Sequence, residues 1–137
     1  MSAMASVAGA RRRILCVDDD EDTRDMMRVL LGEYGYEPVI AASVNDALEQ
    51  AKSGGLALCI LDHWLTDTNG VDLCQQIRAF DEHTPIMFYS GAGYAADIQK
   101  GLGAGAQAYL VKPDFERLKP TIDRLIDEAG SNLSLVM

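Results

Sequence analysis

The sequence contains few of the residues that build disulfide-rich or zinc-binding proteins. Its three cysteines, Cys16, Cys59 and Cys74, form no Cys-x-x-Cys pair. Two of them lie in apolar, strand-like runs, where a thiol behaves as a small hydrophobic group. The two histidines, His63 and His83, have no second ligand at metal-like spacing. We therefore expect no disulfide and no zinc site, and we interpret both histidines as ordinary surface or loop residues without a role.

Long hydrophobic runs are missing as well. No apolar segment approaches the roughly 20 residues that a transmembrane helix needs. The arginines at 11–13 follow a leader of small residues, which is the wrong order for a secretory signal. We therefore expect a cytoplasmic protein that does not insert into a membrane.

Positive charge is scarce, because 12 lysines and arginines stand against 21 aspartates and glutamates, for a net charge of -9. Affinity for nucleic acids comes largely from Lys and Arg side chains that displace counterions from phosphates. We therefore expect no direct nucleic-acid partner.

The length and composition favour a single domain. A chain of 137 residues with 48% hydrophobic content can build one sizeable core. We expect a flexible N-terminal lead at 1–12, one folded domain at 13–129 and a frayed C-terminal tail at 130–137.

Strand-like and helix-like segments alternate along the chain. Short β-prone runs occupy 14–17, 36–42, 58–61, 85–89 and 108–111. Apolar residues at helical spacing occupy 26–34, 44–51, 70–80, 94–104 and the segment from about 120 onward. This alternation predicts an α/β fold with a doubly wound, five-stranded parallel sheet and five helices. The order we expect is the flavodoxin-like 2-1-3-4-5.

Three details of the helices are also predicted. Phe80 should lie on the inner side of the helix that begins at Asn69-Gly70. The helix at 94–104 should be short or mobile, because Gly101 and Gly103 each cost about 1 kcal/mol relative to alanine. The last helix should begin near Pro120, after a turn at 114–118, because proline clashes with a preceding carbonyl inside a helix.

Charged and hydroxyl side chains follow four of the expected strands. Asp18 and Asp19 follow the first, Asp62 the third, Ser90 the fourth and Lys112 the fifth. In the order 2-1-3-4-5, strands one and three are neighbours where the winding reverses, so their carboxylates converge. Carboxylates this close raise one another's pKa unless a cation is present. Mg²⁺, which prefers oxygen ligands, would resolve the conflict.

These segments resemble the receiver domain of two-component response regulators, in particular the chemotaxis-type single-domain regulator. The resemblance covers about 14–128 and rests on Val17-Asp18-Asp19, Leu61-Asp62 with Gly70 eight positions on, Ser90-Gly91, and Tyr109-Leu110-Val111-Lys112-Pro113. One position departs from the family pattern, because the usual proline four residues after the acceptor aspartate is Thr66 here.

The resemblance implies that Asp62 is the phosphoacceptor and that Mg²⁺ is the cofactor. Asp19, Asp62 and the backbone carbonyl of Trp64 would hold the ion directly, and Asp18 would act through its water. A carboxylate can form an acyl phosphate by in-line attack, with the protein supplying position and charge neutralisation.

The resemblance also implies roles at the other strand ends. Ser90 and Lys112 would bind phosphoryl oxygens, and the Lys112-Pro113 peptide bond would be cis. Ser90 and Tyr109 would form the switch, because a hydroxyl drawn toward the phosphoryl group vacates space that the Tyr109 ring can enter.

The predicted function is that of a phosphoacceptor that catalyses only its own phosphorylation and dephosphorylation. A histidine kinase or phosphotransfer protein would donate the phosphoryl group. A downstream protein would read the face formed by 94–104, 108–111 and the last helix. We expect a stand-alone receiver, since little sequence follows residue 130, but the sequence does not decide whether the chain is part of a larger regulator. The kinase, target, oligomeric state and phosphoryl lifetime stay open.

Two alternatives belong to other functional classes. A phosphatase-type hydrolase with an aspartyl nucleophile usually carries a second aspartate two positions on, where this chain has Trp64. A phosphorylation-independent interaction module is disfavoured by the intact acceptor, acidic pair and lysine.

Overall fold

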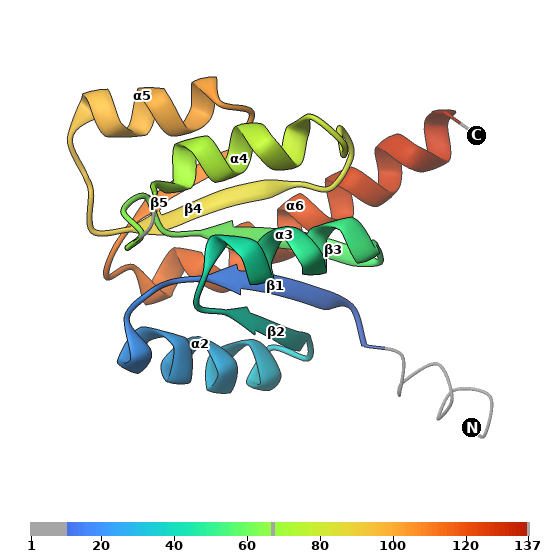
Figure 1. Cartoon of the computed structure of the whole chain (residues 1–137). Coiled ribbons are helices and arrows are strands. Elements are labelled where there is room, and N and C mark those ends of the chain that lie inside the picture. Colours follow the sequence, from blue (N-terminus) through green and yellow to red (C-terminus); the bar gives the residue numbers. More distant parts are fainter. Residues whose placement is uncertain (1–10, 67, 137) are drawn as a thin grey trace.

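The computed structural model describes residues 11–66 and 68–136, which form one alternating series of strands and helices (Figure 1). In chain order the elements are β1 (Arg13–Val17), α2 (Glu21–Glu33), β2 (Glu37–Ala41), α3 (Val44–Ser53), β3 (Leu56–Leu61), α4 (Gly70–Arg78), β4 (Ile86–Ser90), α5 (Ala95–Gly103), β5 (Ala108–Val111) and α6 (Phe115–Val136).

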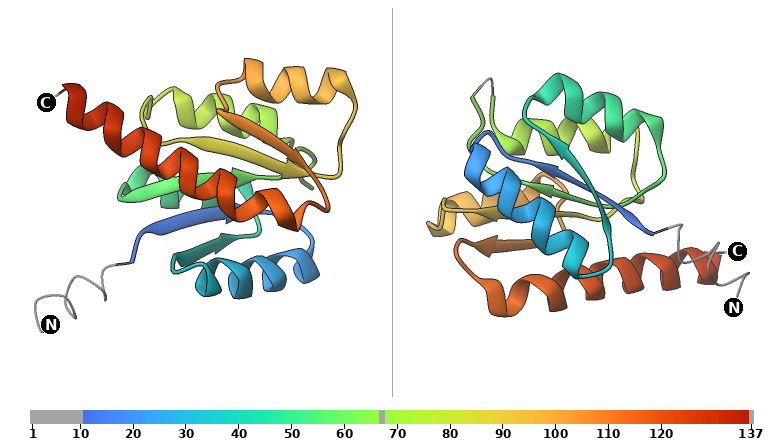
Figure 2. Two further views of the ribbon diagram at one scale, coloured as in Figure 1. Left: turned by 180° about the vertical axis from the view of Figure 1, so that it is seen from behind. Right: turned by 90° about the horizontal axis from the view of Figure 1, so that it is seen from below.

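The five strands form one parallel sheet in the order β2-β1-β3-β4-β5. Helices α3, α4 and α5 cover one face, and α2 and α6 cover the other (Figures 1 and 2). This arrangement confirms the predicted doubly wound fold, its strand order and, within the described residues, its five helices.

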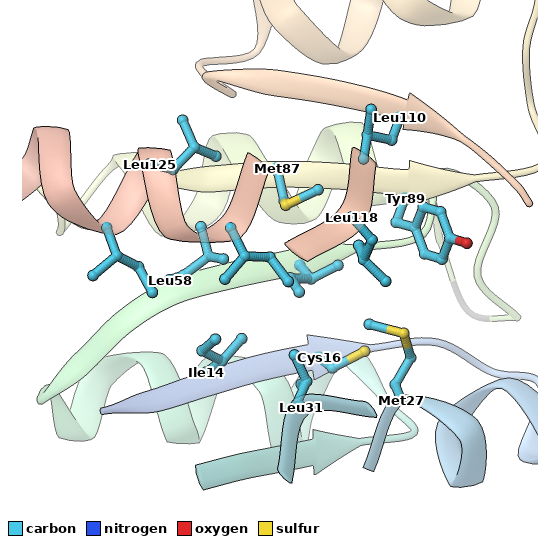
Figure 3. Close-up of a cluster of buried hydrophobic side chains, with 13 residues drawn as sticks. Ile14, Cys16, Met27, Leu31, Leu58, Met87, Tyr89, Leu110, Leu118 and Leu125 are labelled. Carbon is cyan, nitrogen blue, oxygen red and sulfur yellow. The ribbon is translucent and has the colours of Figure 1, made fainter. Parts of the chain in front are cut away.

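Two hydrophobic cores lie on opposite faces of the sheet, because successive strand residues point to alternate sides. In β3, for example, Leu58 and Ile60 face α2 and α6, whereas Cys59 and Leu61 face the other three helices. Figure 3 shows the first core, in which Met27 and Leu31 of α2 and Leu118 and Leu125 of α6 pack on the strands. The three cysteines are buried and unpaired, as the sequence indicated.

Side chains cap three helices at the points where the chain leaves the sheet. Asp20, Ser43 and Asn69 each accept a hydrogen bond from the backbone N–H three residues on, at 2.9, 3.2 and 2.8 Å. Such caps satisfy amide groups that the first turn leaves without a partner. They fix where α2, α3 and α4 begin, and the predicted start of α4 after Asn69 is confirmed.

Two predicted details of the helices are wrong. Helix α6 begins at Phe115 and contains Pro120, whereas we expected a turn there. Asp114 accepts a hydrogen bond from the Arg117 N–H at 3.1 Å and caps the earlier start, and Leu118 joins the buried stripe of the helix. Phe80 lies beyond α4 and is 43% exposed, with the Lys52 ammonium over its ring.

The two ends of the chain also bear on the predicted boundaries. Residues 1–10 of the expected N-terminal lead lie outside the described residues, and β1 begins at Arg13. At the other end α6 runs to Val136, so residues 130–136 are helical where we expected a frayed tail. Gly130 does not adopt the left-handed conformation that would end the helix. Each further residue then adds one helical hydrogen bond. The last turns project past the sheet (Figure 2).

Helix α5 is short, with nine residues, as predicted. Within 11–66 and 68–136, no helix combines the length and the hydrophobicity required to cross a bilayer.

Arg78 connects the end of α4 to the segments on either side of β4. Its Nε donates to the Gly105 carbonyl at 3.0 Å and its Nη2 to the Gln107 side chain at 3.0 Å. Its Nη1 donates to the carbonyls of Asp81 and Thr84 at 3.0 and 2.8 Å. One guanidinium therefore satisfies three loop carbonyls.

Replacing Arg78 by alanine should lower the free energy of unfolding by about 2 kcal/mol, because hydrogen bonds from a charged donor are lost together. Urea denaturation measures this change. Arg124→Ala is the control, since it removes only an exposed ion pair with Glu128 and should cost about 0.3 kcal/mol. Equal losses in the two variants would contradict the structural role of Arg78.

Candidate phosphoryl and metal site

Three carboxylates meet at the carboxyl edge of the sheet. In the parallel register Val17 of β1 lies beside Leu61 of β3, so the residues that follow them emerge side by side. One oxygen from each of Asp18, Asp19 and Asp62 lies within 4.8 Å of the others. The predicted convergence of these side chains is therefore present in the structure.

Lys112, at the end of β5, reaches this cluster. Its Nζ lies 2.7 Å from Oδ2 of Asp18 and 3.7 Å from Oδ2 of Asp62. Burial raises the pKa of Asp18, and the hydrogen bond from Lys112 offsets only part of the rise. Burial lowers the pKa of Lys112, but the bond to Asp18 and the charge of Asp62 outweigh this, so the pKa is raised. The ammonium therefore stays charged and is the internal counterion of the cluster.

The Asp62 carboxylate is both held by a hydrogen bond and partly exposed to solvent. Its Oδ1 accepts a hydrogen bond from the His63 N–H at 2.8 Å. Its side chain is 14% exposed, against 4% for Asp18. Asp18 is held more tightly, because its Oδ1 also accepts from the Asp20 N–H at 2.9 Å. Of these two side chains, Asp62 is the one that an incoming reactant can reach.

The loop after Asp62 contains the departure from the family pattern. The Thr66 hydroxyl donates to Oδ2 of Asp19 at 2.7 Å. Where a proline would stiffen this loop, the threonine ties it to the exposed carboxylate of the acidic pair. Trp64, two positions after Asp62, forms an isolated bridge with Asn69 and is 59% exposed.

Gly70 allows α4 to start directly against the acceptor strand. A Cβ at this position would lie 2.1 Å from the Asp62 carbonyl oxygen and 2.8 Å from the Phe88 ring. The Gly70 N–H donates to the His63 carbonyl at 2.6 Å. A glycine eight positions after Asp62 is therefore required by space.

Ser90 and Tyr109, the two predicted switch residues, are connected through Ala92. The buried Ser90 Oγ accepts from the Ala92 N–H at 3.2 Å, and the Tyr109 hydroxyl donates to the Ala92 carbonyl at 2.7 Å. Burial raises the pKa of the Tyr109 phenol to about 12, so it keeps its proton at neutral pH. The Lys112-Pro113 bond is cis, as the resemblance implied.

His63 was assigned no role from the sequence, but the structure places it inside the site. It is 2% exposed, and its Nδ1 lies 2.9 Å from the Tyr109 hydroxyl. The strand register carries a signal that could have found it, because Leu61, Phe88 and Tyr109 are aligned across β3, β4 and β5. A residue two positions beyond Leu61 points to the same side.

The family model described as the response regulator receiver domain matches residues 14–123. The chain is 31% identical over 130 residues to the DNA-binding response regulator MtrA of Mycobacterium tuberculosis, an alignment that covers 91% of this chain and 57% of that protein. It is 32% identical over 124 residues to the transcriptional regulatory protein ZraR of Salmonella typhimurium, covering 88% of this chain and 28% of that protein.

Solved structures share the fold. A CheY-like response regulator receiver domain protein from Methanospirillum hungatei superposes with a TM-score of 0.84 at 29% identity, covering 89% of this chain and 98% of that one. The chemotaxis protein CheY4 of Vibrio cholerae gives 0.79 at 29% identity, covering 84% and 98%.

The chain spans about half the length, or less, of the curated relatives it matches. Because the first of these relatives is named a DNA-binding response regulator and the second a transcriptional regulatory protein, the comparisons do not support our expectation that nucleic acid is excluded as a partner.

Proposed function

Since the chain belongs to the family of response regulator receiver domains, we propose that Asp62 accepts its phosphoryl group from a histidine kinase or phosphotransfer protein. The observation that supports this proposal is the convergence of one accessible carboxylate, two further carboxylates and a lysine at one sheet edge. The product would be a regulator whose state is carried by an acyl phosphate.

The proposed reaction is an in-line displacement at phosphorus. An oxygen of Asp62 forms the new O–P bond while the N–P bond to the donor imidazole breaks, and the leaving nitrogen takes up a proton. Lys112 is 3.7 Å from Asp62, so a small movement of its flexible stem brings the ammonium to a phosphoryl oxygen. The Ser90 hydroxyl, whose oxygen accepts from the Ala92 N–H, would donate its hydrogen to a second phosphoryl oxygen.

The residues of the cluster fit Mg²⁺ by their chemistry. Three carboxylates supply hard oxygen donors within 4.8 Å of one another. We propose that Asp19, Asp62 and the Trp64 carbonyl hold the ion directly and that Asp18 acts through its water. When bound, Mg²⁺ would neutralise charge on the phosphoryl oxygens.

Asp19→Ala should weaken Mg²⁺ binding roughly tenfold or more, and Asp18→Ala should weaken it less, because direct ligation is worth more than contact through water. Trp64 is the sole tryptophan of the chain, and its carbonyl is one of the proposed ligands, so its fluorescence can follow a Mg²⁺ titration. Equal losses in the two variants would contradict these assignments.

Intact mass measurement after incubation with acetyl phosphate tests the proposed function. We expect one added phosphoryl group when Mg²⁺ is present and none when EDTA removes it. Turnover of p-nitrophenyl phosphate would favour the hydrolase alternative. An unchanged mass together with no effect of beryllofluoride on Trp64 fluorescence would favour the phosphorylation-independent module. We propose that the chain catalyses only its own phosphorylation and dephosphorylation.

We propose that a downstream protein reads the face formed by α5, β5 and α6. Large apolar side chains are exposed at the edges of these elements, with Tyr94 82%, Phe115 53%, Leu102 41% and Val111 37% exposed. Exposed aromatic and aliphatic groups of this kind supply the contact area of protein interfaces. The cytoplasmic location stays a prediction from the sequence.

A further inference from the structure

The side chains of His63 and Tyr109 form a hydrogen bond. Its direction follows from the other bond that the Tyr109 hydroxyl makes. The Tyr109 hydroxyl has one proton, and it donates this proton to the Ala92 carbonyl, which can only accept. The Nδ1 of His63, 2.9 Å from the same oxygen, must therefore carry a hydrogen and donate it. His63 is thus the donor, and Tyr109 is held by one bond on each side.

The backbone of the same residue contacts the acceptor. The His63 N–H donates to Oδ1 of Asp62 at 2.8 Å, and its carbonyl accepts from the Gly70 N–H at 2.6 Å. One residue is therefore fixed to the acceptor and to the start of α4 by its backbone, and to β5 by its ring.

We propose that His63 is a positioning residue that holds the Tyr109 ring inward and couples the loop after Asp62 to strand β5. This inference rests on the proposed function for its role in signalling. In the structure the Tyr109 ring already stacks on Phe88, which differs from our expectation that the ring enters this space only after Ser90 moves. The residue acts through Tyr109 and takes no part in the phosphoryl transfer itself.

The Tyr109 ring is packed closely against its neighbours, which supports its inward position. Tyr109 stacks on Phe88 with ring centroids 5.2 Å apart and an angle of 15° between the rings. A Cβ added to Gly101 of α5 would lie 2.8 Å from the Tyr109 ring and 3.1 Å from the Phe88 ring. The ring therefore occupies the space that the glycine leaves, and its position is transmitted directly to α5.

His63 also gives the ring a support that is independent of Ser90. The Ser90 Oγ accepts from the Ala92 N–H, and Ala92 is the other partner of the Tyr109 hydroxyl, so a rotation of the Ser90 side chain toward a phosphoryl oxygen would disturb the Ala92 support. A ring held by Ala92 alone would loosen at this point. The bond from His63 keeps the ring inward while the loop after Ser90 rearranges.

The first test uses the unmodified protein and needs no variant. Nitrogen NMR of isotope-labelled histidine reports which ring nitrogen carries the proton. We expect His63 to carry a hydrogen on Nδ1 that exchanges slowly with solvent, because the residue is 2% exposed and this hydrogen is bonded to Tyr109. An unprotonated Nδ1 on His63 would overturn the proposal.

The second test measures the ring directly. In protein containing fluorotyrosine, the Tyr109 signal is assigned among five tyrosines by its absence in Tyr109→Phe. Without the hydrogen bond, His63→Phe should raise the population of the outward ring about fivefold. A paramagnetic solute in the solvent detects this as broadening of the Tyr109 signal. An unchanged signal in His63→Phe would refute the coupling.

A matched pair of glycine variants supplies the reference for an outward ring. Gly101→Ala should displace the ring by direct contact, whereas Gly103→Ala, on the same helix with nothing within 4 Å, should leave it in place. His63→Phe should resemble the first of these and not the second. Both tests are made without a phosphoryl group, so their failure bears on His63, whereas a failure to phosphorylate Asp62 bears on the proposed function.

Discussion

Asp62→Asn protein is expected to gain no phosphoryl group under conditions that label the unmodified chain completely. Asparagine has nearly the same shape as aspartate and keeps an oxygen that can accept the His63 N–H, so the loop geometry should persist. The amide oxygen is a far weaker nucleophile and cannot form an acyl phosphate. Intact mass after acetyl phosphate and Mg²⁺ measures the difference.

Asp97→Asn is the matched control, because Asp97 lies in the first turn of α5 and is not one of the three clustered carboxylates. It should be labelled as fully as the unmodified chain. Phosphate that still appeared on an aspartate of the Asp62→Asn protein would place the acceptor elsewhere. The neighbours are the obvious candidates, and Asp18 is disfavoured because Lys112 and the Asp20 N–H already occupy its two oxygens.

The fold could be predicted from the sequence because its signals are local and repeated. Each strand is a short β-prone run, four of the five are followed by a charged or hydroxyl residue, and each helix shows its own spacing, so topology rules leave one simple arrangement. The errors occurred where a local rule competed with packing. Pro120 disfavours a helix interior by its own chemistry, yet the cap at Asp114 and the burial of Leu118 stabilise the earlier start.

The sequence predicts those residues of the candidate site that directly follow a strand. The strand order alone brings four side chains together, because parallel strands end at one edge of the sheet. These side chains are Asp18, Asp19, Asp62 and Lys112. The role of His63 is not a strand-end signal, because it depends on the register that aligns Leu61, Phe88 and Tyr109 across three strands. The bond from Thr66 to Asp19 depends on the path of a loop, and no sequence pattern specifies that path.

Gly70→Ala should have the largest effect on stability of any change considered for this chain, with a loss of about 3 kcal/mol or more. The added Cβ would lie 2.1 Å from the Asp62 carbonyl oxygen, where real contacts below 3.0 Å essentially never occur. Neither atom can turn away, because the oxygen belongs to the backbone at the end of β3 and the Cβ to the first turn of α4. Urea denaturation measures the loss in the free energy of unfolding.

The same substitution should also impair phosphorylation, because relief of the clash moves the backbone that carries Asp62 and His63. Gly103→Ala is the control, since it has open space around its Cβ and should stabilise the protein by up to about 1 kcal/mol through helix propensity alone. If Gly70→Ala were as stable as this control and were labelled at the same rate, α4 could not lie against the acceptor strand as it does here. A less stable protein with a normal labelling rate would instead separate the packing role of Gly70 from the geometry of the acceptor.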